Sequence, residues 1–174
     1  MDSNDTTRGL VVLAVDDEQP ALEEMAFLLG EDSRVGTVLT ASESDEALRI
    51  LNSRQRVGSS GAPVPAGSTT NPMTGTHVAE HTDIDVVFLD IRMPGLDGLE
   101  LARVLAGMET RPVIVFVTAH DDRAVDAYEV GALDYLLKPL RSKRLSEALD
   151  RVVASRSSAP AEPVREGGGD DEVI

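Results

Sequence analysis

Cysteine is absent from the 174 residues, and aromatic residues make up only 3% of the chain. Without thiols the chain has no disulfide, no thiolate metal site and no cysteine nucleophile, a composition that fits a reducing compartment. Because aromatic side chains are so few, a hydrophobic core must be built from valine, leucine, isoleucine and alanine. A hydrophobic fraction of 41% is enough for such a core.

Positive charge is also scarce, since 16 lysines and arginines face 31 acidic residues and the formal net charge is −15. An acidic surface repels nucleic acid phosphates, so these residues are not expected to bind DNA themselves. Met1–Arg8 is polar and lacks the apolar stretch of a signal peptide, and no apolar run approaches the length of a membrane span. We therefore expect a soluble, cytoplasmic protein.

Two stretches have almost no large apolar side chains. Residues 54–82 are rich in glycine, serine, threonine and proline, and residues 156–174 combine prolines with a run of three glycines. Neither stretch can bury enough apolar surface to offset the entropy lost on ordering. We expect a flexible N-terminus at 1–8, a domain at 9–155 interrupted by a flexible insert at 54–82, and an acidic linker at 156–174.

Unbroken runs of valine, leucine and isoleucine are typical of strands that are covered on both faces. Such runs lie at Leu10–Val15, Val86–Leu89 and Val113–Val117, with shorter ones at Val38–Leu39 and Leu133–Leu137.

Helical patterns lie between and after these runs. Leu22, Met25, Ala26 and Leu29 follow the i, i+3, i+4, i+7 spacing, and Pro20 suits the first turn of that helix. Four further helices are expected at Ser44–Leu51, from Asp97 onward, at Arg123–Val130 and at Leu145–Val153.

Several residues have the character of helix ends. Ser44 is the expected cap of its helix, Asp97 with Glu100 resembles a capping box, and Gly131 is expected to end the fourth helix. Strand and helix thus alternate five times, which favours an α/β fold with a doubly wound, five-stranded parallel sheet and five helices. Ligands of such sheets bind at the carboxyl ends of the strands.

Polar residues stand at four of these strand ends. Asp16 and Asp17 follow the first strand, Asp90 follows the third, Thr118 ends the fourth and Lys138 follows the fifth. Three carboxylates at one edge repel one another, and a hard cation such as Mg²⁺ compensates that repulsion. A carboxylate can also attack phosphorus, while Mg²⁺ and a lysine neutralise charge on the transferring group.

Each of these residues also has an ordinary structural interpretation. Asp16 or Asp17 could cap the first helix, Asp90 could be a loop acid, Thr118 a plain strand end and Lys138 a solvated surface lysine. Their joint placement at four strand ends favours a phosphoryl-transfer site. None of the three histidines is assigned a role.

The segments that carry these residues resemble, in order, the signature of response regulator receiver domains. They are Val15-Asp16-Asp17-Glu18, the segment from Phe88 to Gly98 (FLDIRMPGLDG), Val117-Thr118-Ala119 and Lys138-Pro139. The resemblance covers roughly residues 8 to 155 and implies a flavodoxin-like sheet with strand order 2-1-3-4-5.

The resemblance implies a set of roles at the site. Asp90 is the phosphoacceptor, and Mg²⁺ is held by Asp16, Asp17 or both, together with Asp90 and the backbone carbonyl of Arg92. It also implies that a cognate sensor histidine kinase supplies the phosphoryl group. The domain then catalyses only its own phosphorylation and dephosphorylation and is not a multiple-turnover enzyme.

Further roles follow from the same resemblance. Thr118, the backbone of Ala119 and Lys138 contact the phosphoryl group, Thr118 and Tyr135 form the switch, and the bond before Pro139 is cis. Phosphorylation is expected to drive homodimerisation through the fourth helix, fifth strand and fifth helix.

A narrower resemblance is to the receivers of LytTR-type transcriptional regulators. It rests on Thr118-Ala119-His120-Asp121 and on the segment from Ala127 to Leu140. It implies a C-terminal DNA-binding domain, and we expect the native chain to continue past Ile174 into it. The alternative is a stand-alone receiver that acts by binding other proteins.

Three other classes of protein share part of this pattern. A nucleotide hydrolase fits the strand Val86–Leu89 followed by Asp90, but the chain has no G-x-x-x-x-G-K-[ST] loop. A haloacid dehalogenase-type phosphatase needs a second aspartate where Arg92 stands. A pseudo-receiver is expected to lack the aspartate or the lysine, and both are present.

Overall fold

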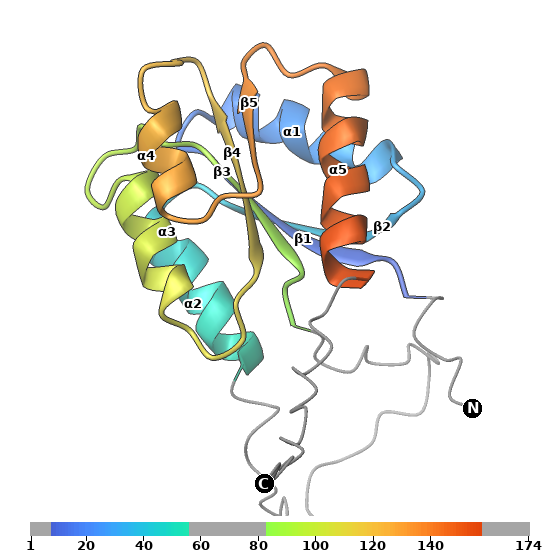
Figure 1. Cartoon of the computed structure of the whole chain (residues 1–174), viewed down its shortest axis with the longest axis horizontal. Helices are drawn as coiled ribbons and strands as arrows, with labels where there is room; N and C mark the ends of the chain where they lie inside the picture. Colours follow the sequence, from blue (N-terminus) through green and yellow to red (C-terminus); the bar gives the residue numbers. More distant parts are fainter. Residues whose placement is uncertain (1–7, 56–82, 158–174) are drawn as a thin grey trace, which may run out of the picture.

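The computed structural model describes residues 8–55 and 83–157. Within these residues, five parallel strands form one sheet in the order β2-β1-β3-β4-β5, and five helices alternate with them (Figure 1). The strands are β1 (Leu10–Val15), β2 (Val35–Ala41), β3 (Val86–Leu89), β4 (Val113–Thr118) and β5 (Asp134–Leu137). The helices are α1 (Gln19–Glu31), α2 (Ser44–Gln55), α3 (Gly98–Ala106), α4 (Ala124–Glu129) and α5 (Ser142–Ser157). The predicted doubly wound sheet and its strand order are confirmed.

Both faces of the sheet are covered by helices. Successive residues of β1 point to opposite faces, so Leu13 packs in a core with α2, α3 and α4, while Val12 packs in a second core with α1 and α5. Figure 1 shows these two layers on either side of the sheet. Because both faces are buried, the central strands need apolar residues at every position, which is why their sequences are unbroken apolar runs.

Three expected helix ends are present. Pro20 lies in the first turn of α1. Asp97 accepts a hydrogen bond from the backbone N–H of Glu100 at 2.9 Å, and the Glu100 carboxylate accepts one from the backbone N–H of Asp97 at 2.9 Å. Gly131 has a φ of +84°, a left-handed conformation that suits glycine just beyond α4.

The expectation that Ser44 caps its helix is wrong. Ser44 is the first residue of α2, and its hydroxyl donates a hydrogen bond to the carbonyl of Leu96 at 2.6 Å. The Glu46 carboxylate accepts the backbone N–H of Ser42 at 2.9 Å, just before the helix. Ser44 therefore joins α2 to the loop before α3, a tertiary contact that local spacing does not reveal.

Several boundaries differ from expectation. β2 has seven residues and not two, because it is an edge strand whose half-exposed positions need not be apolar. α4 is one residue shorter at each end than expected. Val153, where the fifth helix was expected to end, is 38% exposed, and α5 continues beyond it to Ser157. Helices α2 and α5 include residues 54–55 and 156–157, and the remainder of the expected insert and linker lies outside the described residues.

Candidate functional site

The polar residues at the strand ends meet at one edge of the sheet. Asp16 and Asp17 directly follow β1, Asp90 follows β3, Thr118 ends β4 and Lys138 follows β5. The backbone ties neighbouring strand ends together, since the N–H of Asp90 donates to the Val15 carbonyl at 2.9 Å and the N–H of Lys138 donates to the Thr118 carbonyl at 2.8 Å. The parallel register therefore places these side chains side by side.

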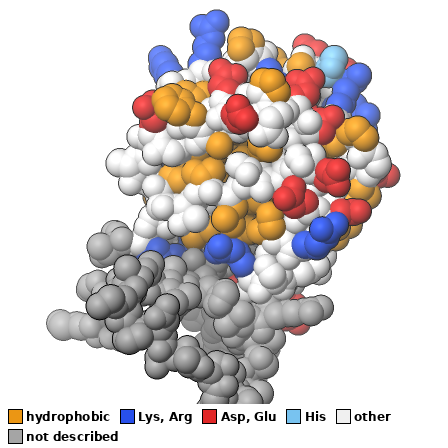
Figure 2. Space-filling model, turned by 180° about the vertical axis from the view of Figure 1, so that it is seen from behind, with side chains coloured by type: hydrophobic (Ala, Val, Ile, Leu, Met, Phe, Trp, Pro, Cys, Tyr) orange, Lys and Arg blue, Asp and Glu red, His pale blue; other side chains and the backbone are white. Residues whose placement is uncertain are grey.

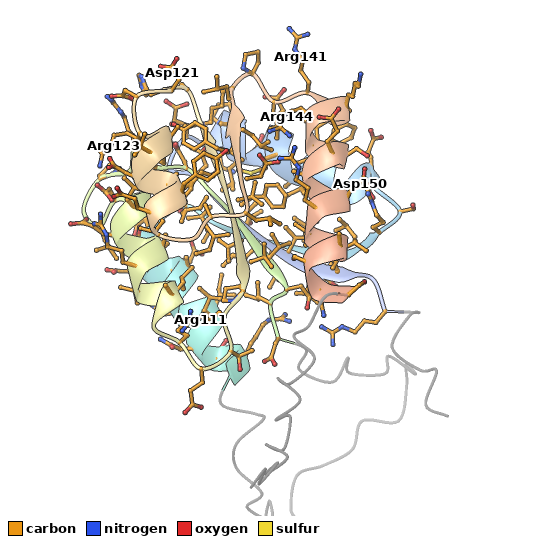
Figure 3. All side chains as sticks on the ribbon, in the orientation of Figure 1. Arg111, Asp121, Arg123, Arg141, Arg144 and Asp150 are labelled. Atoms are coloured by element: carbon orange, nitrogen blue, oxygen red, sulfur yellow. The ribbon has the colours of Figure 1, made fainter. Side chains whose placement is uncertain are left out.

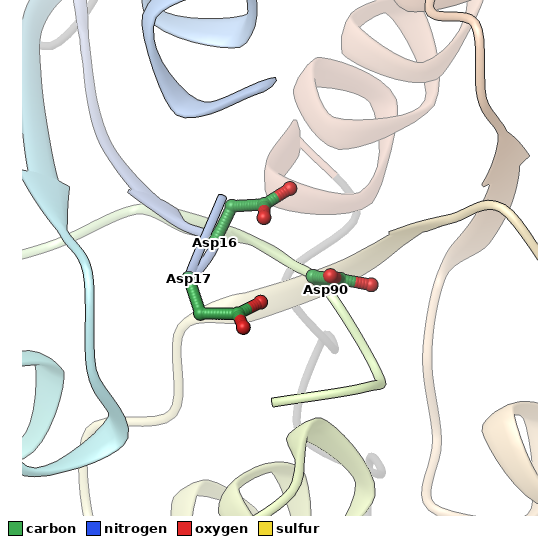
Figure 4. A group of neighbouring side chains, drawn as sticks. All are labelled: Asp16, Asp17 and Asp90. Carbon is green, nitrogen blue, oxygen red and sulfur yellow. The ribbon is translucent and has the colours of Figure 1, made fainter. Parts of the chain in front are cut away.

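Three carboxylates form the centre of the site (Figure 4). Asp16, Asp17 and Asp90 each offer one oxygen, and these oxygens lie within 4.8 Å of one another. Asp16 is fully buried, Asp90 is 5% exposed and Asp17 is exposed. One Asp16 oxygen accepts the backbone N–H of Glu18 at 2.9 Å, which fixes the orientation of that carboxylate.

Lys138 supplies positive charge to this cluster. Its Nζ lies 2.6 Å from an Asp16 oxygen and 3.5 Å from an Asp90 oxygen. One ammonium group cannot balance three carboxylates, so the cluster keeps an excess of negative charge. The donor set consists of oxygens only and fits a hard divalent cation such as Mg²⁺, which takes one or two carboxylates and keeps several waters.

Burial and charge shift the pKa values of both partners. Burial raises the pKa of the Asp90 carboxyl, and the nearby charge of Asp16 raises it further, while Lys138 and the backbone N–H of Arg92 oppose this rise without cancelling it. Burial by itself lowers the pKa of Lys138, but the hydrogen bond to Asp16 and the charges of both carboxylates outweigh it, so the pKa is raised. Lys138 is therefore protonated at neutral pH.

Asp17 opens the cluster to solvent. It lines a groove together with the start of α2, including Glu43 and Asp45, and with the loop before α3, including Met93 and Leu96. Asp17 is therefore the carboxylate of the cluster that faces this groove.

The backbone of His120 links Thr118 and Tyr135. Thr118 is 1% exposed, and its hydroxyl accepts a hydrogen bond from the N–H of His120 at 3.4 Å. The hydroxyl of Tyr135 donates to the His120 carbonyl. Sequence reasoning gave His120 no role, and the side chain gives no signal because both contacts involve the backbone. Burial, together with Asp121 and Asp122, raises the pKa of Tyr135.

Other expected site residues lie at the same edge. The Lys138–Pro139 peptide bond is cis, the geometry that the resemblance implies. The Arg92 side chain pairs with Asp122 at 3.3 Å on the surface, and its backbone N–H contributes a hydrogen bond toward Asp90. Ala119 lies between Thr118 and His120.

Gly98 belongs to the receiver motif, and the structure shows why a glycine stands at this position. A Cβ at this position would lie 2.1 Å from the Asp90 carbonyl oxygen and 2.8 Å from the Ile91 Cα. The N–H of Gly98 also donates to the Ile91 carbonyl at 2.7 Å. The first turn of α3 thus packs directly on the backbone that carries Asp90.

Comparison with known proteins is consistent with this arrangement. The family model described as response regulator receiver domain matches residues 54–150. The chain belongs to this family. The receiver is 38% identical over 142 residues to the positive alginate biosynthesis regulatory protein of Pseudomonas aeruginosa, covering 81% of this chain and 46% of that protein. It is 31% identical over 158 residues to the transcriptional regulatory protein YpdB of Escherichia coli K12, covering 88% of this chain and 53% of that protein.

Solved structures show the same receiver fold. The response regulatory domain of protein mrkE from Klebsiella pneumoniae superposes with a TM-score of 0.64 at 28% identity, covering 86% of this chain and 99% of that one. The receiver spans about half the length of the curated relatives it matches. Within the described residues, no helix is long and apolar enough to cross a membrane.

Proposed function

We propose that Asp90 accepts a phosphoryl group from a sensor histidine kinase, in a reaction that depends on Mg²⁺. The observation that carries this proposal is the cluster of Asp16, Asp17 and Asp90 oxygens within 4.8 Å, with Lys138 beside it. Asp16, Asp17, Asp90 and the Arg92 carbonyl would hold Mg²⁺. Bound there, Mg²⁺ offsets negative charge on the carboxylates and on the phosphoryl oxygens.

The chain's own residues then perform the transfer. An Asp90 oxygen forms a bond to phosphorus as the P–N bond to the kinase histidine breaks, and the electron pair of that bond returns to the imidazole ring. Lys138 and the Thr118 hydroxyl stabilise the phosphoryl oxygens, with the backbone of Ala119 as a further donor. The aspartyl phosphate is later hydrolysed, so the receiver modifies only itself and is not a multiple-turnover enzyme.

Intact-mass measurement tests the assignment. With acetyl phosphate and Mg²⁺, the wild-type chain should gain one acid-labile phosphoryl group, and it should gain none when EDTA is present. The Asp90→Asn variant should stay unmodified, whereas Asp121→Asn, a matched change of an exposed loop aspartate, should behave like wild type. Wild-type uptake by Asp90→Asn would contradict the assignment.

The switch would run from Thr118 to Tyr135 through their shared contacts with His120. Phosphorylation adds about two negative charges near Thr118. Movement of the Thr118 hydroxyl toward them would release the N–H of His120 and allow Tyr135 to change its packing. The phosphoryl group thereby shifts an existing equilibrium between two arrangements.

The α4–β5–α5 face would carry the output as a phosphorylation-dependent homodimer. Val125 on α4 is 71% exposed, Tyr128 60% and Leu137 on β5 50%, a set of apolar side chains that a partner can cover. Sedimentation with and without beryllofluoride, a phosphoryl mimic, measures this. Equal self-association in the two states would exclude this dimer as the output while leaving the phosphorylation of Asp90 untouched.

We further propose that the complete regulator controls transcription in the cytoplasm through a LytTR-like DNA-binding domain. The support is that relatives about twice as long are named as regulatory proteins, and that this part is acidic. On the face shown in Figure 2, acidic side chains are spread among hydrophobic ones and the basic ones lie mainly around its edges. A basic DNA-binding surface would therefore belong to the other domain. A stand-alone receiver that binds other proteins is the alternative, and the reading frame beyond the codon for Ile174 decides between them.

A further inference from the structure

Asp85 lies at the end of the sheet opposite the phosphorylation site, one residue before β3. Its side chain is only 6% exposed. One carboxylate oxygen accepts the backbone N–H of Val11 at 2.7 Å, and the N–H of Asp85 donates to the Val11 carbonyl at 2.9 Å. The carboxylate is therefore fixed against β1.

Two arginines from distant parts of the chain meet at this carboxylate. Arg8, just before β1, places its guanidinium 3.4 Å from one oxygen of Asp85, and Arg156, in the last turn of α5, pairs with the other oxygen. Figure 1 shows the starts of β1 and β3 and the end of α5 together at this end of the sheet. A single buried carboxylate thus connects three segments.

Among the described residues, the last turn of α5 has no buried side chain, and the hydroxyls of Ser155 and Ser157 bond only carbonyls of the helix itself, those of Val152 and Val153. Val152 is the last buried residue of the helix, and residues 153–157 are all exposed. The final carbonyl groups of a helix also lack intrahelical partners, so the ends of helices fray. The pair between Arg156 and Asp85 lies beyond the last apolar contact and is well placed to hold this turn.

We propose that Asp85 is an electrostatic latch that holds the last turn of α5 against the amino end of the sheet. Releasing the latch frees this turn without involving Asp90, and this goes beyond the proposed phosphorylation. Both arginine side chains are partly exposed, Arg8 by 46% and Arg156 by 40%, so salt or an anionic group that competes for Arg156 can open the latch.

Amide hydrogen exchange by NMR on the whole chain tests the latch. Arg156→Gln and Asp85→Asn should each raise the exchange rates of the amides at 154–157 by roughly three- to tenfold. Wild type in 1 M NaCl should approach the rates of Arg156→Gln. Lys143→Gln, an exposed change at the other end of α5, should leave these rates unchanged.

A double-mutant cycle separates the latch from the interaction of Arg156 with the helix dipole. If the latch exists, the amides at 154–157 in the double variant Asp85→Asn/Arg156→Gln should exchange no faster than in either single variant. Additive effects, or no change in Arg156→Gln, would overturn the proposal. Because the Arg156 side chain is partly exposed, Arg156→Gln should keep the fold, so the test remains possible if Asp85→Asn does not fold. Phosphorylation by acetyl phosphate should stay within about twofold of wild type in Arg156→Gln, whose change lies at the far end of the sheet.

Discussion

At the scale of single residues, the site places like charges close together inside the protein. Asp16 and Asp90 are both buried beside the more exposed Asp17, and Lys138 is nearer to Asp16 than to Asp90. Lys138 is thus held mainly by Asp16, and burial together with the charge of Asp16 keeps the pKa of Asp90 raised even though Lys138 opposes the rise. Under the proposed function, Asp90 is a buried acceptor whose negative surroundings Lys138 balances only in part, so that a bound cation would be needed for the rest.

Lys138→Met should slow phosphorylation of Asp90 by roughly a hundredfold, because one cationic partner of the developing charge is lost. Mg²⁺ should bind as well as before or more tightly, since the carboxylates lose a competing positive charge. The rate is measured by intact mass with acetyl phosphate, and Mg²⁺ affinity by calorimetry. Lys143→Met is the matched control on the surface of α5. Mg²⁺ binding lost in parallel with the rate would show that Lys138 acts by holding the carboxylates in place.

Gly98→Ala should destabilise the domain by roughly 1–3 kcal/mol and slow phosphorylation, because the new methyl group must displace the backbone of Asp90. Gly107→Ala is a suitable control at the other end of α3, where the nearest atom to a Cβ is 3.5 Å away. Thermal unfolding and the acetyl phosphate reaction measure the two effects. Equal melting temperatures and equal phosphorylation rates in the two variants would show that the close approach at Gly98 matters neither for stability nor for the reaction.

At the scale of elements, ion pairs attach α5 to its neighbours. Arg144 extends from α5 toward β5 (Figure 3) and holds the buried carboxylate of Asp134 with two hydrogen bonds of 3.0 and 2.8 Å, and Arg151 adds a third contact at 2.9 Å. On the other side, Arg34 from the α1–β2 loop bonds the hydroxyl of Ser146 at 2.8 Å. Helix α5 is thus fixed by polar contacts at both flanks as well as by its buried apolar face.

The Asp32–Arg34 pair makes the α1–β2 loop sensitive to acid. The hydrogen bond from the Arg34 side chain lowers the pKa of Asp32 against the opposing effect of burial. A carboxyl with a lowered folded-state pKa stabilises the fold above its unfolded pKa, and this contribution is lost as pH falls through the folded value. Asp32→Asn should therefore lower the melting temperature by a few degrees at pH 7, and the difference from wild type should shrink toward pH 3. A difference that stays constant with pH would point to lost packing and not to charge.

At the scale of the whole molecule, the two ends of the sheet carry different groups of polar residues. The carboxyl ends of the strands carry the carboxylate cluster at which we propose phosphorylation, and the amino ends carry the contacts of Asp85 with Arg8 and Arg156. The described neighbours of residues 56–82 are α2 and β3, whose last and first residues also lie at this amino end (Figure 1). The described residues that flank that segment therefore lie at the end of the sheet away from Asp90.

Replacing residues 58–81 with a short Gly-Ser link should leave phosphorylation unchanged and shift the melting temperature by no more than a few degrees. The physical reason is that loop-closure entropy depends only weakly on loop length, and that the composition of this segment offers few apolar side chains to a core. Calorimetry and intact mass measure both effects. A large fall in melting temperature would mean that the segment packs on the domain.

The fold class and the gathering of three aspartates at one edge of the sheet could be predicted from the sequence. Strands buried on both faces require unbroken apolar runs, so the strands Leu10–Val15 and Val86–Leu89 could be predicted directly from the sequence. The Asp97–Glu100 capping box could be predicted because both of its hydrogen bonds join residues only three positions apart in the sequence. The gathering of Asp16, Asp17 and Asp90 followed from the rule that parallel strands end at one edge.

Contacts between distant segments could not be predicted in this way, because they depend on how the whole chain packs. The hydroxyl of Ser44 bonds a carbonyl 52 residues away, the edge strand β2 needs no apolar pattern, and Gly98 is required by the nearby backbone of Asp90. The convergence of Arg8 and Arg156 on Asp85 has no local signature either. Hydrophobic periodicity and helix capping depend on residues that are close in the sequence. The partner of a buried polar group depends on how the whole chain packs.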